Sequence, residues 1–371
     1  MEIKGKKKEI INALAVGGTM SGISKTIPIL DYAKIRVKGD IMIVSSFSGD
    51  VAIARKCKLE NQSSENEKSF LVVAKDLISL LKTLRDDDVT LVANFDKNNI
   101  TISHKKGEMS LPIQDANDFP VIENGVDAEQ FELPLGTLLE WLQRGKSFII
   151  QDELRPIMAS IYLYIKDNEF GCCVTDANRL FHDYVPYNSD IAQDATITHK
   201  AINSLISLLN DSQNEDIVKM AVDSKNISFT TQNGKLTCRK LEGKYPNFKA
   251  VIPQNSENVV TIDKDELLDS IMRASLTTSA SNCLEINLQG QTLDIRGIDA
   301  DFGKCSREQC LCNHTGDDIR IGAKGVFFID CVNAIISNEI KLEFSTSSRP
   351  IVLYDKEYPN KRIILMPMGL A

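Results

Sequence analysis

The stretch VTLVANFDKNNITI at residues 89–102 has a counterpart, IVKMAVDSKNISF, at residues 217–229. In each stretch apolar residues recur at every second position, a polar turn interrupts this pattern, and the pattern then resumes. A period of two is typical of a strand, so each stretch predicts a β-hairpin. Matched positions also share residue types, namely Asp96, Asn99 and Ile100 in the first stretch and Asp223, Asn226 and Ile227 in the second. The chain therefore carries at least two copies of one structural unit.

Helical periodicity recurs along the chain at the same spacing, about 125 to 129 residues. One amphipathic helix opens each third of the chain and is marked by Ile10 and Leu14, by Leu138 and Leu142, and by Leu267 and Ile271. A second helix is marked by Leu77 and Leu81, by Ile202 and Leu209, and by Phe328, Cys331, Val332 and Ile335. The third copy is slipped by two positions relative to the lysines near these helices, which are Lys75, Lys200 and Lys324. We predict an α+β protein of three repeated domains, residues 1–125, 126–253 and 254–371, each with two helices packed on antiparallel sheets.

The 371 residues carry 43 Lys and Arg against 51 Asp and Glu, a formal charge of −8. This balance argues against a protein whose whole surface binds nucleic acid by charge, but it allows a local basic face. Basic residues recur in or beside the repeat helices of all three copies: Lys75, Lys82, Arg144, Lys146, Lys200, Arg273 and Lys324. This recurrence is expected if one side of the molecule meets a polyanion.

Neither an apolar leader after Met1 nor an apolar run of the roughly 18 residues needed to cross a bilayer is found. Nine cysteines, two of them adjacent at Cys172 and Cys173, fit a reducing compartment. We expect a cytoplasmic protein with no membrane role.

Catalytic signatures are scarce in the sequence. Phosphate-binding GxxxxGK[ST] and GxGxxG loops are absent, and the four histidines suggest no triad. Zinc ligands do cluster at Cys305, Cys310, Cys312 and His314, but C-x4-C-x-C-x-H lacks the usual C-x2-C turn. We predict a protein that is not an enzyme and has neither cofactor nor metal, and we keep a zinc-dependent enzyme using this cluster as an alternative.

Four stretches resemble one known family: TIPIL at residues 26–30, VTDANRL at 174–180, KLEGKYPNFKAVIP at 240–253 and ILMPMGL at 364–370. The family is the beta sliding clamp of bacterial DNA polymerase III. The resemblance implies a head-to-tail homodimer, a ring of six domains whose helices face duplex DNA without reading its sequence. It also adds Lys25, next to a position where the family has arginine, to the DNA-facing residues. An open monomeric scaffold descended from a clamp is a further alternative.

The resemblance also implies partner sites. An apolar cleft between the second and third domains receives peptides from the replicative polymerase, the clamp loader and repair enzymes. Its expected residues are Met158, Thr175, Asn178, Arg179, Leu180, Pro246, Val251, Ile364, Leu365, Met366, Pro367 and Met368. The expected dimer interface joins Met109 and Leu111 of one copy to Leu276 and Thr277 of the other. Ala177, Asn178 and Gly369 depart from the family pattern of Gly, His and Arg, which predicts altered peptide preference.

Overall fold

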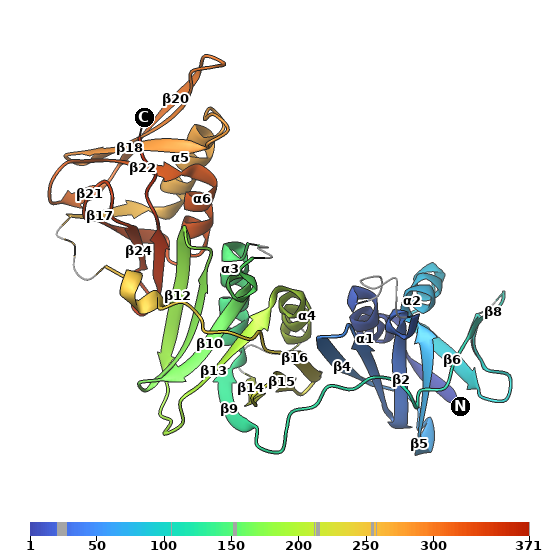
Figure 1. The fold of residues 1–371 in the computed structure, drawn as a ribbon. Helices are drawn as coiled ribbons and strands as arrows, with labels where there is room; N and C mark the ends of the chain where they lie inside the picture. Colours follow the sequence, from blue (N-terminus) through green and yellow to red (C-terminus); the bar gives the residue numbers. More distant parts are fainter. Residues whose placement is uncertain are drawn as a thin grey trace. The chain divides into compact units, whose positions relative to one another are not determined.

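The computed structural model describes residues 1–20, 28–104, 106–150, 154–210, 212, 216–253, 256 and 258–370. Lys25, Ala371 and the start of the TIPIL stretch lie outside the described residues. The chain divides into two compact units, Met1–Leu139 with Lys200–Lys240, and Glu140–His199 with Leu241–Ala371. Figure 1 labels the elements of both units, and each unit is described separately below.

The first unit contains two antiparallel sheets, with strand orders β5-β2-β3-β4-β16-β15-β14-β9 and β1-β6-β7-β8. The strands are β1 (Glu2–Lys6), β2 (Tyr32–Gly39), β3 (Ile41–Phe47), β4 (Val51–Lys58), β5 (Ser64–Val73), β6 (Asp88–Asn94), β7 (Asn99–His104), β8 (Gly107–Pro112), β9 (Glu129–Pro134), β14 (Ile217–Val222), β15 (Asn226–Thr231) and β16 (Gly234–Arg239). The helices are α1 (Lys7–Met20), α2 (Ala74–Thr83) and α4 (His199–Asn210), whose first residue belongs to the second unit.

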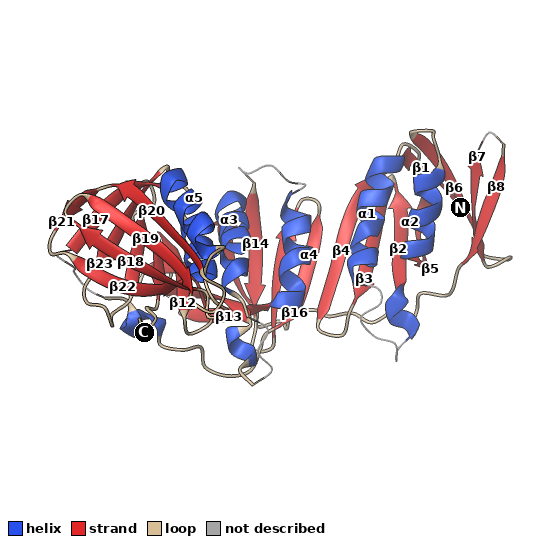
Figure 2. Ribbon diagram, turned by 90° about the horizontal axis from the view of Figure 1, so that it is seen from above, coloured by secondary structure: helices blue, strands red, loops and turns tan. Residues whose placement is uncertain are grey.

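Helices α1 and α2 lie side by side over one face of β2, β3 and β4 (Figure 2). In α2, Leu77 and Leu81 are fully buried in the core, whereas Lys75 and Lys82 on the opposite face are exposed. Strand β3 shows strict alternation of buried and less buried residues. Both periodicities place apolar side chains between the helices and the sheets, so one core is shared by the two layers.

The second unit contains sheets with strand orders β13-β10-β11-β12-β25-β24-β23-β17-β21 and β20-β19-β18-β22. The strands are β10 (Ser160–Lys166), β11 (Glu169–Thr175), β12 (Arg179–Pro186), β13 (Gln193–Thr198), β17 (Asn258–Asp263), β18 (Cys283–Gln289), β19 (Thr292–Asp299), β20 (Lys304–Leu311), β21 (Asn313–Thr315), β22 (Ile319–Lys324), β23 (Glu339–Phe344), β24 (Ile351–Asp355) and β25 (Arg362–Leu365). The helices are α5 (Lys264–Ser275) and α6 (Gly325–Asn333), and α3 (Leu135–Gly145) crosses the boundary between the units.

The predicted repeat is confirmed strand by strand. The two predicted hairpins are β6–β7 and β14–β15. Helices α2 and α4 begin one residue before Lys75 and Lys200, whereas α6 begins one residue after Lys324, which is the predicted slip of two positions. The orders β5-β2-β3-β4, β13-β10-β11-β12 and β22-β18-β19-β20 are equivalent, and so are β1-β6-β7-β8, β9-β14-β15-β16 and β17-β23-β24-β25. The chain is an α+β protein of three repeated domains.

The three repeats form two compact units and not three, because hydrogen-bonded sheets run through both junctions between repeats. Strand β4 pairs with β16, and β12 pairs with β25. At the first junction a Cβ on Gly234 would lie 2.1 Å from the carbonyl oxygen of Ala54, so only glycine allows the two strands this close. The boundaries at residues 125 and 253 stay predictions.

Candidate functional site

The floor of the expected partner cleft is formed by β11, β12 and β25. Leu180 on β12 pairs with Thr175 on one side and with Ile364 on the other, so these three side chains share one face of the sheet. Leu180 and Ile364 pack in an apolar cluster with Tyr245 and Phe248. The structure therefore brings together residues from three sequence stretches that are far apart in the chain.

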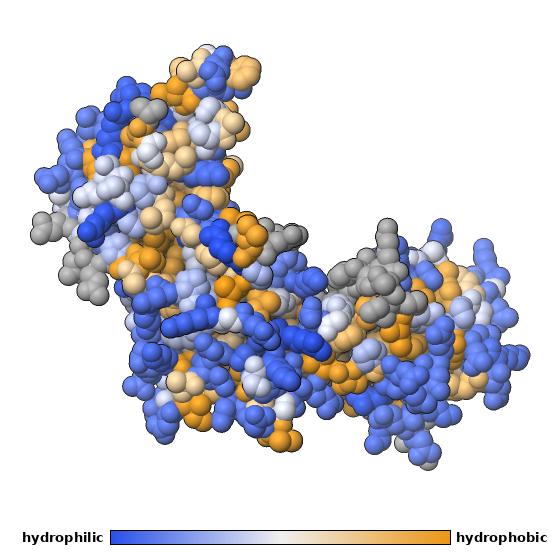
Figure 3. Space-filling model, in the orientation of Figure 1, coloured by the Kyte–Doolittle hydropathy of each residue, from blue (hydrophilic) through white to orange (hydrophobic). Residues whose placement is uncertain are grey.

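The wall of this site is the segment of residues 241–253, which contains the short helix η4 (Phe248–Val251). A groove of about 530 Å³ is lined by Met158 and Pro246, among others. Val251 and Met366 are 51% and 38% exposed, which makes them available to a partner. Figure 3 shows apolar side chains gathered around η4, where they interrupt the polar surface. An exposed apolar patch on a folded protein usually marks an interaction site.

The chain end lies beside the cleft. The Met366 amide donates to the Asn178 carbonyl at 2.7 Å, and the Met368 amide donates to the Gly322 carbonyl at 2.8 Å. Residues 366–368 therefore run from the edge of the cleft to β22. Asn178 is exposed at the tip of the β11–β12 turn, and Pro367 lies between the two anchored methionines.

Arg179 and Leu365, also expected in the cleft, are buried at 5% and 0% exposure, and their place in a partner site stays a prediction. They pair with each other on β12 and β25, one residue away from the Leu180–Ile364 pair, and so face the opposite side of the sheet. The Arg179 guanidinium contacts Asp176 at 2.9 Å and also pairs with Asp330 on α6. Burial by itself would lower the pKa of Arg179, but these carboxylates raise it above its ordinary value. Arg179 supports the cleft from below by tying β12 to α6.

A buried lysine joins the same strands at a second point. The Lys361 ammonium, fully buried before β25, lies 2.9 Å from Glu140 on α3, 3.9 Å from Asp355 and 4.0 Å from Asp183. The Trp141 indole donates to Asp183 at 3.0 Å. Burial raises the pKa of Asp183 to about 6, although the nearby Lys361 and Trp141 favour its ionised form. This group connects elements of the second and third repeats.

The aromatic cluster that flanks the cleft has no counterpart among the residues predicted from the sequence. Tyr162 and Tyr245 stack with their ring centroids 4.4 Å apart, and the His182 Nε2 lies 2.8 Å from the Tyr164 hydroxyl. Burial, together with the charges of Lys249 and Arg362, lowers the pKa of His182 to about 4. The alternating aromatic residues of SIYLYIK, at residues 160–166, were the available signal for one face of this cluster.

The expected DNA-facing residues fall into two groups. Lys75, Lys82, Lys146 and Lys200 are exposed, and none of them forms an ion pair within the described part of the chain. The others are engaged: Arg144 donates to the carbonyls of Asn333 and Ile335 at the end of α6, Arg273 pairs with Glu308 at 2.8 Å, and Lys324 lies 4.5 Å from the Phe327 ring centroid. Arg144 is consequently a helix-end partner, because cations satisfy the unpaired carbonyls there. Lys25 cannot be placed because it lies outside the described residues.

The expected dimer residues lie on or beside two open sheet edges. Met109 and Leu111 belong to β8, the last strand of its sheet, and pack partly against the core of the first repeat. Leu276, which ends α5, is 79% exposed. Thr277 bonds to Ser306 on β20, the edge strand of the last sheet, at 2.6 Å. Each edge presents unpaired backbone groups that proteins usually cover or pair.

The cysteine and histidine cluster does not assemble a zinc site in the structure. Cys305 and Cys310 are five residues apart on one strand, about 17 Å at 3.4 Å per residue. Both ring nitrogens of His314 are engaged, with the Gly290 carbonyl at 2.8 Å and the Asn258 amide oxygen at 2.7 Å. Across the described residues, no group of three or more His, Cys, Asp or Glu side chains could hold a metal ion.

Among the described residues, no helix is both long and apolar enough to cross a membrane.

Models for the N-terminal, central and C-terminal domains of the DNA polymerase III beta subunit match residues 1–123, 132–247 and 249–369. The beta sliding clamp of Rickettsia bellii (strain RML369-C) is 25% identical over 97% of this chain and 97% of its own. That of Staphylococcus aureus (strain Mu50) is 24% identical over 99% of each chain.

Solved structures show the same fold. A crystal structure of a sliding clamp from Pseudomonas aeruginosa bound to griselimycin superposes with a TM-score of 0.92 at 19% identity and covers 100% of both chains. The sliding clamp from Bacillus subtilis gives a TM-score of 0.88 at 21% identity, again over 100% of both chains.

Proposed function

Because the chain belongs to the family of bacterial DNA polymerase III beta subunits, we propose that two copies close head to tail around duplex DNA and tether a polymerase to it. Members of this family are sliding clamps, which act as processivity factors without catalysis. Tethering raises the local concentration of the polymerase at the primer end, so repeated binding from solution is unnecessary.

The pattern of strand pairing between repeats is the observation that supports a closed ring. In the first two repeats, the strand that ends the order β5-β2-β3-β4 or β13-β10-β11-β12 pairs with the last strand of the next repeat. These pairs are β4 with β16 and β12 with β25. In the same position β20 has no last strand beside it, and among the described strands β8 is the last strand of a repeat that has no such partner. If β20 of each copy pairs with β8 of the other, the backbone groups of all four open edges are hydrogen-bonded. Two such joints close a dimer of six domains.

The contact with DNA follows from the exposed lysines of the helices. Lys75 and Lys82 form one stripe on α2, and Lys146 and Lys200 extend the positive charge to the second repeat. Lysine tips attract phosphates without reading bases, so they hold the duplex weakly at any sequence. A ring that retains DNA by closure and contacts it weakly can slide, and the net charge of −8 is then carried by the other surfaces.

The partner site is the cleft on β11, β12 and β25. Its floor contains Leu180 and Ile364. Val251 on η4 and Met366 directly after β25 offer exposed apolar side chains beside this floor. Methionine and proline side chains adapt to varied apolar anchors, which suits a site visited by the polymerase, the clamp loader and repair enzymes.

Closure around DNA is tested by loading the protein onto nicked circular DNA and then linearising the circle. Retention on the circle and release after cutting are expected. Equal loss before and after cutting, or a monomer mass in light scattering, would instead indicate an open scaffold. As a charge control, Lys75→Ala with Lys82→Ala should reduce loading and flatten its salt dependence without changing the dimer mass.

The cleft is tested with the clamp-binding peptide of the replicative polymerase and the double variant Val251→Asp with Met366→Asp. Both residues are partly exposed, so folding should be retained while peptide affinity falls more than about tenfold, or 1.4 kcal/mol. Ile217→Asp on β14, 47% exposed at a site outside the cleft, is the matched control. Unchanged affinity in the cleft variant would show that the peptide binds elsewhere.

A further inference from the structure

The junction between the first two repeats is built like the junction that carries the proposed partner cleft. At both junctions a third strand pairs with a last strand, β4 with β16 and β12 with β25. In both, a proline-containing connector lies beside the sheet, and Pro120 precedes Pro246 by about the repeat length. Phe119 and Tyr245, each directly before its proline, anchor the two connectors, and both are 6% exposed. Equivalent backbones thus produce two equivalent places for a groove.

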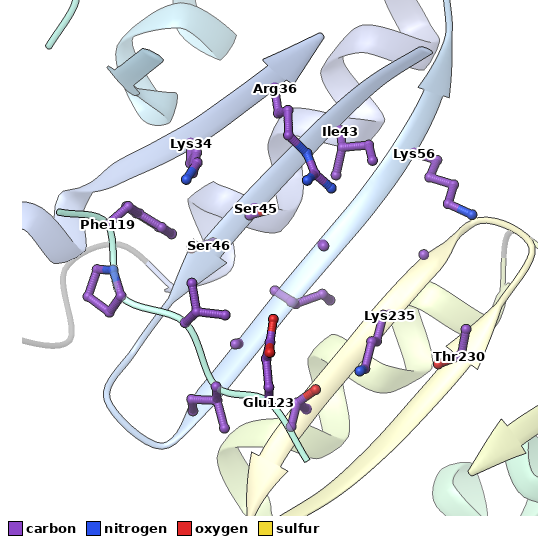
Figure 4. Close-up of a pocket in the computed structure, with 18 of the residues that line it drawn as sticks. Lys34, Arg36, Ile43, Ser45, Ser46, Lys56, Phe119, Glu123, Thr230 and Lys235 are labelled. Carbon is purple, nitrogen blue, oxygen red and sulfur yellow. The ribbon is translucent and has the colours of Figure 1, made fainter. Parts of the chain in front are cut away.

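A groove of about 470 Å³ is present at the first junction, within the range of ligand-binding pockets. The floor of the groove contains the small side chains of Ser45 and Ala54, which are paired across β3 and β4. Lys235 on β16 pairs with Ala54 from the other side. Figure 4 shows the connector carrying Phe119 and Glu123 along one border of the groove. The small floor residues leave room for an extended chain to lie across β3, β4 and β16.

The charge of this groove differs from that of the partner cleft. Lys34 and Arg36 project from β2, Lys56 from β4 and Lys235 from β16 (Figure 4). Two carboxylates, Glu67 and Glu123, are the acidic residues of the lining, so cations are in excess.

The cations are only partly used within the protein. Arg36 lies 3.7 Å from Glu67, and Lys34 donates to the Ala116 carbonyl at 3.3 Å. No ion pair engages Lys56 or Lys235 within the described residues, and both are exposed. These two ammonium groups are available to a partner.

We propose that this groove is a second partner site, distinct from the cleft at residues 241–253, and that it binds an acidic peptide segment with an apolar anchor. The anchor packs on Ile43, Pro120 and Val121, the last 66% exposed. Carboxylates of the segment pair with Lys56 and Lys235. Single-stranded nucleic acid fits less well. Among the described residues that line the groove, Phe119 is the only aromatic one and it is buried, so none of them exposes a ring on which a base could stack.

The test uses the full-length protein and a fluorescein-labelled peptide of about nine residues, with a leucine pair between aspartates. Saturable anisotropy is expected, and a peptide with lysine in place of aspartate should not bind. Lys56→Glu with Lys235→Glu should weaken binding at least about tenfold, because two attractive contacts become repulsive. Lys97→Glu with Arg349→Glu changes the net charge equally at exposed sites outside the groove and should stay within twofold of wild type.

The location of the bound peptide is read by hydrogen exchange, with protection expected in residues 43–56 and 230–237. Absence of saturable binding, or equal loss in both charge-reversal variants, would overturn the proposal. Loss in Val251→Asp with Met366→Asp would also overturn it, because the probe would then occupy the cleft at residues 241–253. If an oligothymidylate binds more tightly than the peptide and is lost in Lys56→Glu with Lys235→Glu, the groove takes nucleic acid and the peptide assignment is wrong.

Discussion

Replacing Lys361 by methionine should destabilise the junction between the second and third repeats. The ammonium group has no exposed surface and lies within 4.0 Å of Glu140, Asp355 and Asp183. Methionine has a similar length and no charge, so the variant removes the cation while it largely fills the same space. The three carboxylates then lose their shared counterion.

The expected loss is about 3–5 kcal/mol of unfolding free energy, the range found when one partner of a buried ion pair is removed. The loss should depend on pH. The folded pKa of Asp183 is about 6 and its ordinary value is 3.8. A carboxyl group whose pKa is raised by folding stabilises the fold below its unfolded pKa and loses this contribution as pH rises through the folded value. At pH 5 Asp183 is mostly protonated, so less uncompensated charge remains in Lys361→Met and its deficit should be smaller than at pH 8.

The single tryptophan of the chain, Trp141, reports this region because its indole donates to Asp183. Urea unfolding followed by its fluorescence at pH 5 and pH 8 measures both quantities. Lys356→Met is the matched control, since Lys356 pairs with Glu339 at 2.8 Å on the exposed surface, where such pairs contribute little. A deficit in Lys361→Met no larger than that of the control, or one that grows on acidification, would refute the reasoning.

Three further outcomes are expected. Gly234→Ala should lower the free energy of unfolding by about 1–3 kcal/mol, because the added Cβ forces β16 away from β4. Gly369→Ala should be neutral, because a Cβ there meets nothing within 4 Å. Equal effects of the two substitutions would show that close approach of the strands is not the cause. The pKa of His182 is about 4 in the folded protein against an ordinary value of 6.5, so the unfolded chain binds the proton more readily and the protein loses stability as pH falls from 6.5 to 4. His182→Phe should therefore lose about 3 kcal/mol less unfolding free energy than wild type over this pH range. The same loss in both proteins would disprove it. Leu276→Asp should halve the mass in light scattering while Ile217→Asp leaves a dimer, and a dimeric Leu276→Asp protein would exclude the proposed joint.

The repeat, the hairpins and the helix pairs were determined by the sequence alone, because their signals are local. Alternation at residues 89–102 and 217–229 depends only on neighbours along one strand, and the stripe of Leu77 and Leu81 depends only on one helix. Family membership was likewise readable, since the short stretches at residues 174–180 and 240–253 carry it.

Tertiary structure decided where the side chains of those residues lie. Leu180 and Arg179 are neighbours in one motif, yet Leu180 faces the cleft and Arg179 faces α6, because β25 pairs on one edge of β12 and a helix covers one face. Arg144 follows the pattern of the DNA-facing residues but is taken by the end of α6. The basic groove beside Lys56 and Lys235 exists only because β4 meets β16. Each of these outcomes depends on contacts between segments far apart in the chain, which no local periodicity encodes.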